Sequence, residues 1–274
     1  MTTAAISQRD AGRTTRATLL TILGEAVLRD GRKVWQETLV RALETSGATT
    51  SAARQAVSRA SRDGWLTSER VGRRALMSVT DSTRERLVQA RERAWAFGAP
   101  VRWDGRWLLI TLSVPEERRD QRYQIRSQLS WLGFGSLGNG VWISPHVHHE
   151  DAAIRVLQSG PDPIECLVFT AEPCRAHDPK QVARATWDLD ELRVRYRDFH
   201  RTFSRAKPRN PSAIFAVWIR MITEWRKFPG MDPELPDSLL PDKWPRQSAY
   251  ELFLSHHKEW ADLALEYFRD LEGS

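Results

Sequence analysis

The chain has 274 residues, of which 41% are hydrophobic and 28% charged, with a formal net charge of +6. This length is typical of about two domains, and the composition is that of a soluble globular protein. The longest apolar stretch is too short to cross a bilayer and the N-terminus is polar, so we expect no membrane segment and no signal peptide. The only cysteines, Cys166 and Cys174, exclude a disulfide framework, and we expect a cytoplasmic protein.

Positive charge is concentrated in the N-terminal third. Residues 1–95 hold 17 Lys and Arg against 10 Asp and Glu, whereas residues 96–274 hold 24 against 25. A basic segment attracts phosphate and accelerates association with nucleic acid. The charge distribution therefore points to nucleic acid as a partner of this third.

The first elements predicted are a flexible arm and two helices. The arm covers residues 1–13, and Arg13 and Arg16, which follow its polar start, would lie near a DNA backbone. Apolar residues at helical spacing then predict helices over Thr14–Leu28 and Val34–Glu44. The second buries Trp35, Leu39 and Leu43, and ends at Thr45-Ser46-Gly47, a short connection of the kind found in helix–turn–helix motifs.

A third helix follows, with Thr50 or Ser51 as the expected N-cap and Gly64 at its C-terminal stop. Ala53, Val57 and Ala60 lie on one apolar face. The opposite face and its flanks carry side chains suited to base edges and phosphates in a major groove. These candidate DNA-binding residues are Ser51, Arg54, Gln55, Ser58, Arg59 and Arg62.

A basic hairpin completes the N-terminal module. Its strands lie at Trp65–Thr67 and Ala75–Val79, and the turn lies around Val71–Arg74. Arg70, Arg73 and Arg74 are candidates for contacts with the DNA backbone or minor groove. We interpret residues 14–80 as a winged helix–turn–helix domain that binds double-stranded operator DNA.

The middle of the chain predicts a small α/β domain. Residues 81–101 form a connecting helix and linker, and residues 102–172 form the domain. Its predicted elements are a strand at 106–114, a helix at 117–132, an Asn-Gly hairpin at 136–144, a helix at 151–158 and a strand at 165–170. The first of these helices is expected to turn Tyr123, Ile125, Leu129 and Leu132 toward the core. The order βαββαβ is that of a ferredoxin-like α/β sandwich.

The last third, residues 173–274, is predicted as a helical domain for effector binding and dimerisation. Helices are expected over 187–203, 212–228 and 248–271, with a proline-rich connection over 229–245. The fold class of the whole chain is therefore α+β.

Six longer motifs stand out along the chain: RQAVSRASRDGW (54–65), VGRR (71–74), WDGRW (103–107), WLGFGSLGNGVWISP (131–145), WDLDELRVRY (187–196) and EWRKFPGMDPELPDSLLPDKWP (224–245). Together these motifs resemble the PaaX family of bacterial transcriptional repressors. They occur in order from about Thr15 to Leu265. Ala60 and the stretch Ala75-Leu76-Met77 depart from the family pattern, so the operator sequence is expected to differ.

The resemblance implies a homodimeric repressor of phenylacetate-type aromatic catabolism, released from its operator by an aryl-acyl-CoA thioester such as phenylacetyl-CoA. Such a ligand needs cationic side chains beside an aromatic-lined cavity. The effector-site candidates are Trp142, His146, Trp187, Trp225 and Arg226, although a Trp on a strand or helix is more often part of the core.

Signals for catalysis are weak, so we predict no enzyme, no cofactor and no metal. Gly133–Gly138 matches GxGxxG but follows a helix instead of a strand. His146, His148 and His149 have no standard zinc spacing to Cys166, Cys174 and His177. Asp104 precedes a strand that carries no acidic residue. Two alternatives stay open, a metal-dependent nucleic-acid enzyme built on the ferredoxin-like domain and a DNA-binding protein without an effector.

Overall fold

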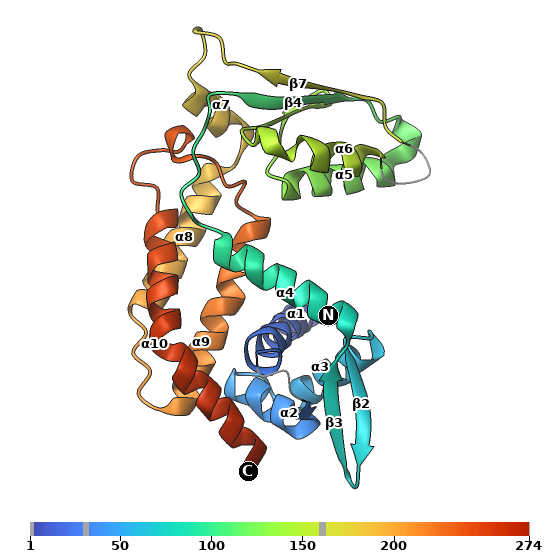
Figure 1. Ribbon diagram of the computed structural model, residues 1–274, viewed down its shortest axis with the longest axis vertical. Helices are drawn as coiled ribbons and strands as arrows, with labels where there is room; N and C mark the ends of the chain where they lie inside the picture. The colour runs from blue at the N-terminus through green and yellow to red at the C-terminus, as the bar shows by residue number, and fades with distance from the viewer. Residues whose placement is uncertain (1–2, 30–32, 159–162, 274) are drawn as a thin grey trace. The chain divides into compact units, whose positions relative to one another are not determined.

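The structure, a computed structural model, describes residues 3–29, 33–158 and 163–273 and is of mixed α and β class (Figure 1). The chain forms two compact units. The first contains residues up to 96 together with 199–227 and those from 250 onward, and the second contains 97–198 and 228–249. The last third, predicted as one helical domain, is therefore shared between the units. No helix among the described residues is both long and apolar enough to cross a membrane.

The first unit begins with α1 (Thr3–Ile22), which continues into the π-helical turn η1 (Leu23–Val27). The predicted first helix buries the expected side chains, including Leu19, Ile22 and Val27. It starts earlier than predicted, so the segment assigned to a flexible arm is helical from Thr3 onward. Met1 and Thr2 lie outside the described residues.

The second predicted helix is correct only from its third residue. Val34 and Trp35 form β1, which pairs antiparallel with β3 (Arg74–Val79) through Val34↔Met77 and Trp35↔Leu76. The helix α2 (Gln36–Thr45) starts after this strand, and α3 (Thr50–Arg62) follows it. Trp35 is half-buried, whereas Leu39 and Leu43 are fully buried.

The hairpin of β2 (Leu66–Val71) and β3 completes a three-stranded sheet of order β1-β3-β2 and extends away from the neighbouring helices (Figure 1). Helix α4 (Asp81–Ala96) follows it. Two later helices, α9 (Pro211–Trp225) and α10 (Arg246–Gly273), pack against this module. Thr223 donates to Thr21 over 2.9 Å, and the Trp225 indole donates to the Ala94 carbonyl over 2.8 Å. Helix α9 therefore holds both α1 and α4.

The second unit contains a four-stranded antiparallel sheet of order β5-β6-β4-β7. Its elements are β4 (Trp107–Leu112), α5 (Arg119–Trp131), β5 (Gly135–Gly138), β6 (Val141–Ser144), α6 (Glu150–Gln158) and β7 (Cys166–Ala171), with short 3-10 turns η2 (Glu116–Arg118) and η3 (Val147–His149). Asn139 and Gly140 have φ of 49° and 76°, which fits the two-residue turn that Asn-Gly favours.

The two faces of this sheet are covered differently. Helices α5 and α6 lie side by side on one face, where Ile110, Leu129 and Trp142 share an apolar cluster (Figure 1). On the other face, Trp107 and Ile143 pack with α7 (Pro179–Thr186), the start of α8 (Leu189–Ser204) and the proline-rich segment. Helix α7 was not predicted. Tyr123, predicted in the core, is 75% exposed, because its position on α5 is turned away from the sheet.

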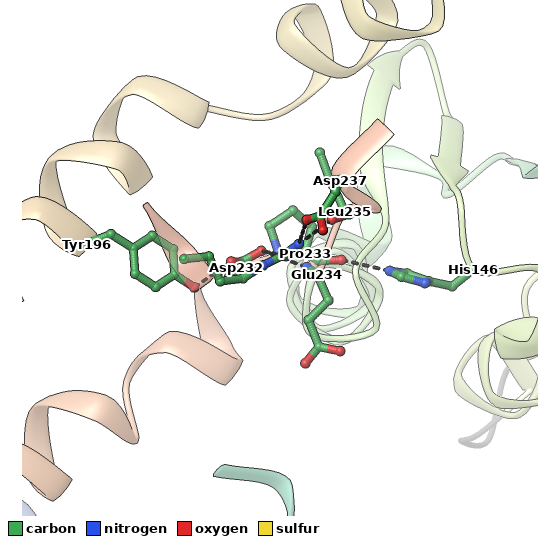
Figure 2. A network of polar contacts seen from close by, with 8 residues as sticks. His146, Tyr196, Asp232, Pro233, Glu234, Leu235 and Asp237 are labelled. Atoms are coloured by element: carbon green, nitrogen blue, oxygen red, sulfur yellow. Dashed lines mark hydrogen bonds and ion pairs between the residues drawn. The ribbon is translucent and has the colours of Figure 1, made fainter. Parts of the chain in front are cut away.

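The proline-rich segment is held by buried polar groups (Figure 2). It contains the 3-10 turns η4 (Phe228–Gly230) and η5 (Asp237–Leu239). Tyr196 on α8 donates to Asp232 over 2.6 Å, and Arg246 lies 3.5 Å from the other oxygen of Asp232. His146, in the short connection between β6 and η3, donates to the Pro233 carbonyl over 2.9 Å. These bonds fix an irregular segment that the sequence predicted only as a connection.

Candidate nucleic-acid interface

Helix α3 is held by its apolar face and by its N-cap. Ala53, Val57 and Ala60 are buried as predicted. The N-cap is Thr49, and Thr50 and Ser51, the predicted caps, lie in the first turn. The Thr49 hydroxyl accepts a hydrogen bond from the Ala52 amide over 3.3 Å. Only the residue before the helix has the extended backbone that a cap requires, here with ψ of 154°.

The turn between α2 and α3 is four residues long, and Gly47 in it has φ of +96°. A side chain at that φ would be strained, so glycine suits the position. Thr50 on α3 also donates to the Glu44 carboxylate on α2. The two helices are therefore fixed to each other by a tight turn and by a side-chain bond across it.

The predicted polar face of α3 is exposed to solvent. All six predicted residues on the helix are exposed, and the helix contains no acidic residue. The side chains of Arg54, Gln55, Arg59 and Arg62 make no hydrogen bond or ion pair with another described residue. Three guanidinium groups and one carboxamide are therefore available to a ligand from one helix surface.

The hairpin arginines are exposed as well, but two of them have partners. Arg70 donates to the Gly72 carbonyl over 3.3 Å, and the Arg74 guanidinium lies 4.3 Å from the centre of the Trp35 ring. Arg73 makes no hydrogen bond or ion pair within the described chain. A cation held over an aromatic ring keeps its charge but loses mobility, so Arg74 is pre-oriented at the hairpin.

Sequence reasoning missed Trp35 as part of this interface, since its pairing depends on β1, which was predicted as helix. It also missed Lys33, which lies 2.5 Å from Glu69 on β2. This pair compensates the one acidic side chain of the β2 strand. No local pattern in the sequence signals either contact, because the partners are more than 30 residues apart.

The effector-site candidates are divided between the two units. Trp225 is fully buried in the first unit, and the pKa of its neighbour Arg226 is lowered by burial. The other three lie in the second unit: Trp142 on the α5–α6 side of the sheet, Trp187 on the opposite side, and His146 on the Pro233 carbonyl. Trp142 and Trp187 line two separate cavities.

The residues considered for catalysis have structural partners. Asp104 accepts hydrogen bonds from the backbone and guanidinium of Arg106 over 2.7–2.9 Å, and these bonds lower the pKa of its carboxyl. His146 and His149 bind the Pro233 and Leu132 carbonyls, each over 2.9 Å. Within the described residues, no group of three or more His, Cys, Asp or Glu side chains is placed to hold a metal ion.

Profiles of one protein family match almost the whole of the chain. Three family profiles match consecutive parts of the chain: the PaaX-like protein profile at residues 14–83, the PaaX protein central Cas2-like domain at 100–183 and the PaaX-like protein C-terminal domain at 187–270. The chain belongs to the PaaX family. The first profile contains the whole of α2, α3 and the β2–β3 hairpin, so the exposed basic surface lies within a family domain.

Two individual proteins are also similar to the chain. The transcriptional repressor PaaX of Escherichia coli strain K12 is 26% identical over 263 residues, which cover 90% of this chain and 80% of that protein. The structure of the uncharacterized protein Rv0674 from Mycobacterium tuberculosis matches with a TM-score of 0.60 at 20% identity, over 90% of this chain and 97% of that one. The Mycobacterium tuberculosis protein thus shares the fold of this chain over nearly its whole length.

Proposed function

We propose that this PaaX-family chain is a DNA-binding transcriptional repressor in which residues 14–80 form a winged helix–turn–helix domain. The observation that carries the proposal is the surface of α3, where Ser51, Arg54, Gln55, Ser58 and Arg62 are exposed. In a helix–turn–helix protein, the second helix of the motif lies in the major groove of DNA, and its N-terminal residues contact base edges. Arg and Gln make the two-bonded contacts to guanine and adenine that distinguish base pairs.

The second part of the proposal assigns the remaining arginines to the DNA backbone. Arg59, at the flank of α3, and Arg70, Arg73 and Arg74, in the hairpin, would contact phosphates or enter the minor groove. The stacking of Arg74 on Trp35 supports this role, because a fixed guanidinium loses little entropy on binding. The β2–β3 hairpin, which carries Arg70, Arg73 and Arg74, extends away from the neighbouring helices and supports this assignment (Figure 1).

The third part concerns regulation. We assign the sheet of the second unit to the ferredoxin-like class, on the strength of its βαββαβ order and its β7-β4-β6-β5 arrangement. The regulated genes would be an aromatic-acid cluster of the phenylacetate type, and an aryl-acyl-CoA would release the repressor from DNA. The name of the Escherichia coli relative supports repression.

Homodimerisation would place two α3 helices in successive major grooves, about one helical turn or a multiple apart. An effector acts by favouring a dimer geometry in which the two helices no longer match this spacing. The packing of α9 on α1 and α4 supports such a link, because movement of α9 would displace elements beside α3.

A gel-shift titration on the DNA upstream of the protein's own gene cluster tests the proposal, with a scrambled duplex as control. We expect a dissociation constant of about 10⁻⁸ M or tighter on the operator, and release by phenylacetyl-CoA but not by phenylacetate. Equal affinity for operator and scrambled DNA at every salt concentration would refute specific binding. Specific binding that no acyl-CoA changes would leave a DNA-binding protein without this effector.

A further inference from the structure

Strand β7 forms one edge of the four-stranded sheet, where it pairs with β4 (Figure 1). Apart from this pairing, residues 166–171 form no hydrogen bond with any other residue that the structure describes. An open edge presents a row of backbone donors and acceptors, and such a row is a template for a further strand. One edge of the sheet is therefore available for pairing.

Strand β7 lacks the features that protect edge strands in other proteins. Its sequence, CLVFTA, contains no charged residue and no proline. Its register with β4 runs without a shift from Cys166 to Ala171, so no bulge interrupts it. The opposite edge strand, β5, is only four residues long, and its register with β6 shifts between Ser136 and Gly138. The sheet thus has one interrupted edge and one regular, open edge.

Two large apolar side chains lie exposed beside the open edge. Leu167 is 62% exposed and Phe169 is 51% exposed. They are two residues apart on the strand and therefore point to the same face of the sheet, the face away from α5 and α6. Neither belongs to the apolar clusters that cover the two faces of the sheet. Exposed apolar side chains that gather next to an open edge indicate an interaction surface.

A second copy of β7 fits this edge by symmetry. Residues opposite each other in an antiparallel pair have the same orientation, so two identical strands related by a two-fold axis pair only where the two residue numbers add to an even number. Pairing about Val168 meets this condition. It places Val168 opposite its own copy and Leu167 opposite Phe169 of the partner subunit. Glu165 then lies opposite the small side chain of Ala171, and no two carboxylates face each other.

The neighbouring registers that symmetry allows are less favourable. Pairing about Leu167 would place Glu165 opposite Phe169 of the partner subunit, and pairing about Phe169 would place Glu172 opposite Cys166. Cys166 packs against the apolar cluster under α5 and α6. Each of these registers sets a carboxylate against an apolar surface, where it loses hydration without gaining a partner. The first register avoids both contacts.

We propose that β7 pairs antiparallel with β7 of a second copy of this chain, about Val168. The two four-stranded sheets join into one sheet of eight strands. Leu167 and Phe169 of both copies form one apolar cluster of cross-strand pairs on its exposed face. The inference rests on the proposed function, because it gives the repressor homodimer its contact surface. The sequence predicts dimerisation in residues 173–274, whereas β7 lies before them.

Sedimentation equilibrium of the full chain tests the proposal, with the dissociation constant of the dimer as the readout. We expect Phe169→Lys to raise this constant by about tenfold or more, because two-fold symmetry repeats the lost contact and the added charge. Leu167→Lys should act in the same way. Both side chains are exposed, so the variants should keep the wild-type circular dichroism spectrum. The matched control is Leu137→Lys, 48% exposed on β5, which should leave the constant unchanged.

Charge exchange tests the register. In the pair about Val168, the double variant Leu167→Lys with Phe169→Glu sets a lysine opposite a glutamate twice, so the dimer should be tighter than that of Leu167→Lys alone. The double variant Leu167→Lys with Phe169→Lys sets like charges opposite each other and should dimerise more weakly than either single variant. Absence of recovery in the first double variant overturns the pairing about Val168. A wild-type chain that stays monomeric overturns the interface, as does a Phe169→Lys variant that dimerises like the wild type.

Operator binding, measured in parallel by gel shift, separates this inference from the proposed function. Phe169→Lys should bind the operator more weakly and a scrambled duplex as the wild type does, because β7 is part of neither α3 nor the β2–β3 hairpin. A monomeric wild-type chain that still prefers the operator would overturn the β7 contact and leave the repressor function standing. A dimer that is sensitive to Phe169→Lys but binds operator and scrambled DNA equally would support the contact and refute specific repression.

Discussion

The guanidinium of Arg16 on α1 lies 4.1 Å from the centre of the Trp65 ring and 3.5 Å from the carboxylate of Asp63. Asp63 is the C-cap of α3, and Trp65 leads into β2. Arg16 therefore joins α1 to the C-terminal end of α3. The sequence alone predicts instead that Arg16 belongs to an N-terminal arm near the DNA backbone.

This contact predicts a structural effect for Arg16→Ala. The change should lower the free energy of unfolding by about 1 kcal/mol, since it removes one exposed cation–π contact and one surface ion pair. Urea denaturation measures this loss. Arg16→Lys keeps the charge without the flat stacking surface and should lose less. Unchanged stability, together with weaker binding to every duplex, would instead assign Arg16 to the DNA backbone.

If α3 contacts base edges, Arg54→Ala should lose DNA affinity to an extent that depends on the DNA sequence. Its operator affinity should fall by about 1–3 kcal/mol, and its affinity for random DNA by much less. Arg59→Ala is the matched control on the same helix and should weaken both duplexes by similar amounts. Titrations of both variants on both duplexes test the assignment. Equal losses on the two duplexes for Arg54→Ala would remove Arg54 from the base-reading residues.

The hairpin tip predicts a change in salt dependence. Each phosphate contact releases counterions and contributes about 0.9 to the slope of log affinity against log salt concentration. Arg73→Ala should reduce the slope by about that amount and weaken all sequences alike. Arg102→Ala, an exposed arginine of the second unit, serves as the control and should leave the slope unchanged. A slope equal to the wild type for Arg73→Ala would contradict a backbone contact.

The sequence predicted those elements whose signals are local. The periodicity of Ala53, Val57 and Ala60 indicated the buried face of α3, and Asn139-Gly140 indicated the β5–β6 turn. In both cases the deciding interactions lie within a few residues. The exposure of Arg54 and Gln55 followed from the same periodicity, so most of the candidate DNA surface could be predicted.

The sequence does not predict local structure that depends on residues far away in the chain. Val34 and Trp35 continue a helical pattern, but pairing with Met77 and Leu76 makes them a strand. The packing of α9 on α4 likewise depends on a contact that no local pattern predicts, between Trp225 and Ala94, 131 residues apart. Trp142 and Trp187 pack on opposite faces of the sheet, and the sequence alone does not reveal which face of a sheet a tryptophan joins.

Buried histidines predict loss of stability in acid. Burial lowers the pKa of His146 from 6.5 to about 4, and that of His257 likewise to about 4. The His257 Nδ1 accepts a hydrogen bond from the Trp218 indole over 3.1 Å, which only the neutral ring can do. The folded state therefore binds fewer protons than the unfolded state between about pH 4 and 6.5, so stability falls as pH decreases through this range.

For His146, which is 4% exposed, the shift corresponds to about 3 kcal/mol lost between pH 6.5 and 4. Urea midpoints measured from about pH 7 to 4.5 test this. His146→Gln retains a donor for the Pro233 carbonyl without a titrating ring, and its midpoint should depend less on pH than that of the wild type. Identical pH profiles for the two proteins would exclude His146 as a source of the acid sensitivity.

The buried network around the proline-rich segment predicts unequal effects for its members (Figure 2). Tyr196→Phe removes one hydrogen bond to Asp232 and should cost about 1–3 kcal/mol. Asp232→Ala should cost about 3–5 kcal/mol, because it leaves Arg246, 4% exposed at its side chain, without its buried partner. Denaturation of both single variants and the double variant measures the coupling, with the exposed Tyr123→Phe as control. The double variant should be less destabilised than the sum of the two, since the lost bond is counted twice. Strict additivity would mean that Tyr196 and Asp232 stabilise the segment independently, and that the bond between them contributes nothing measurable.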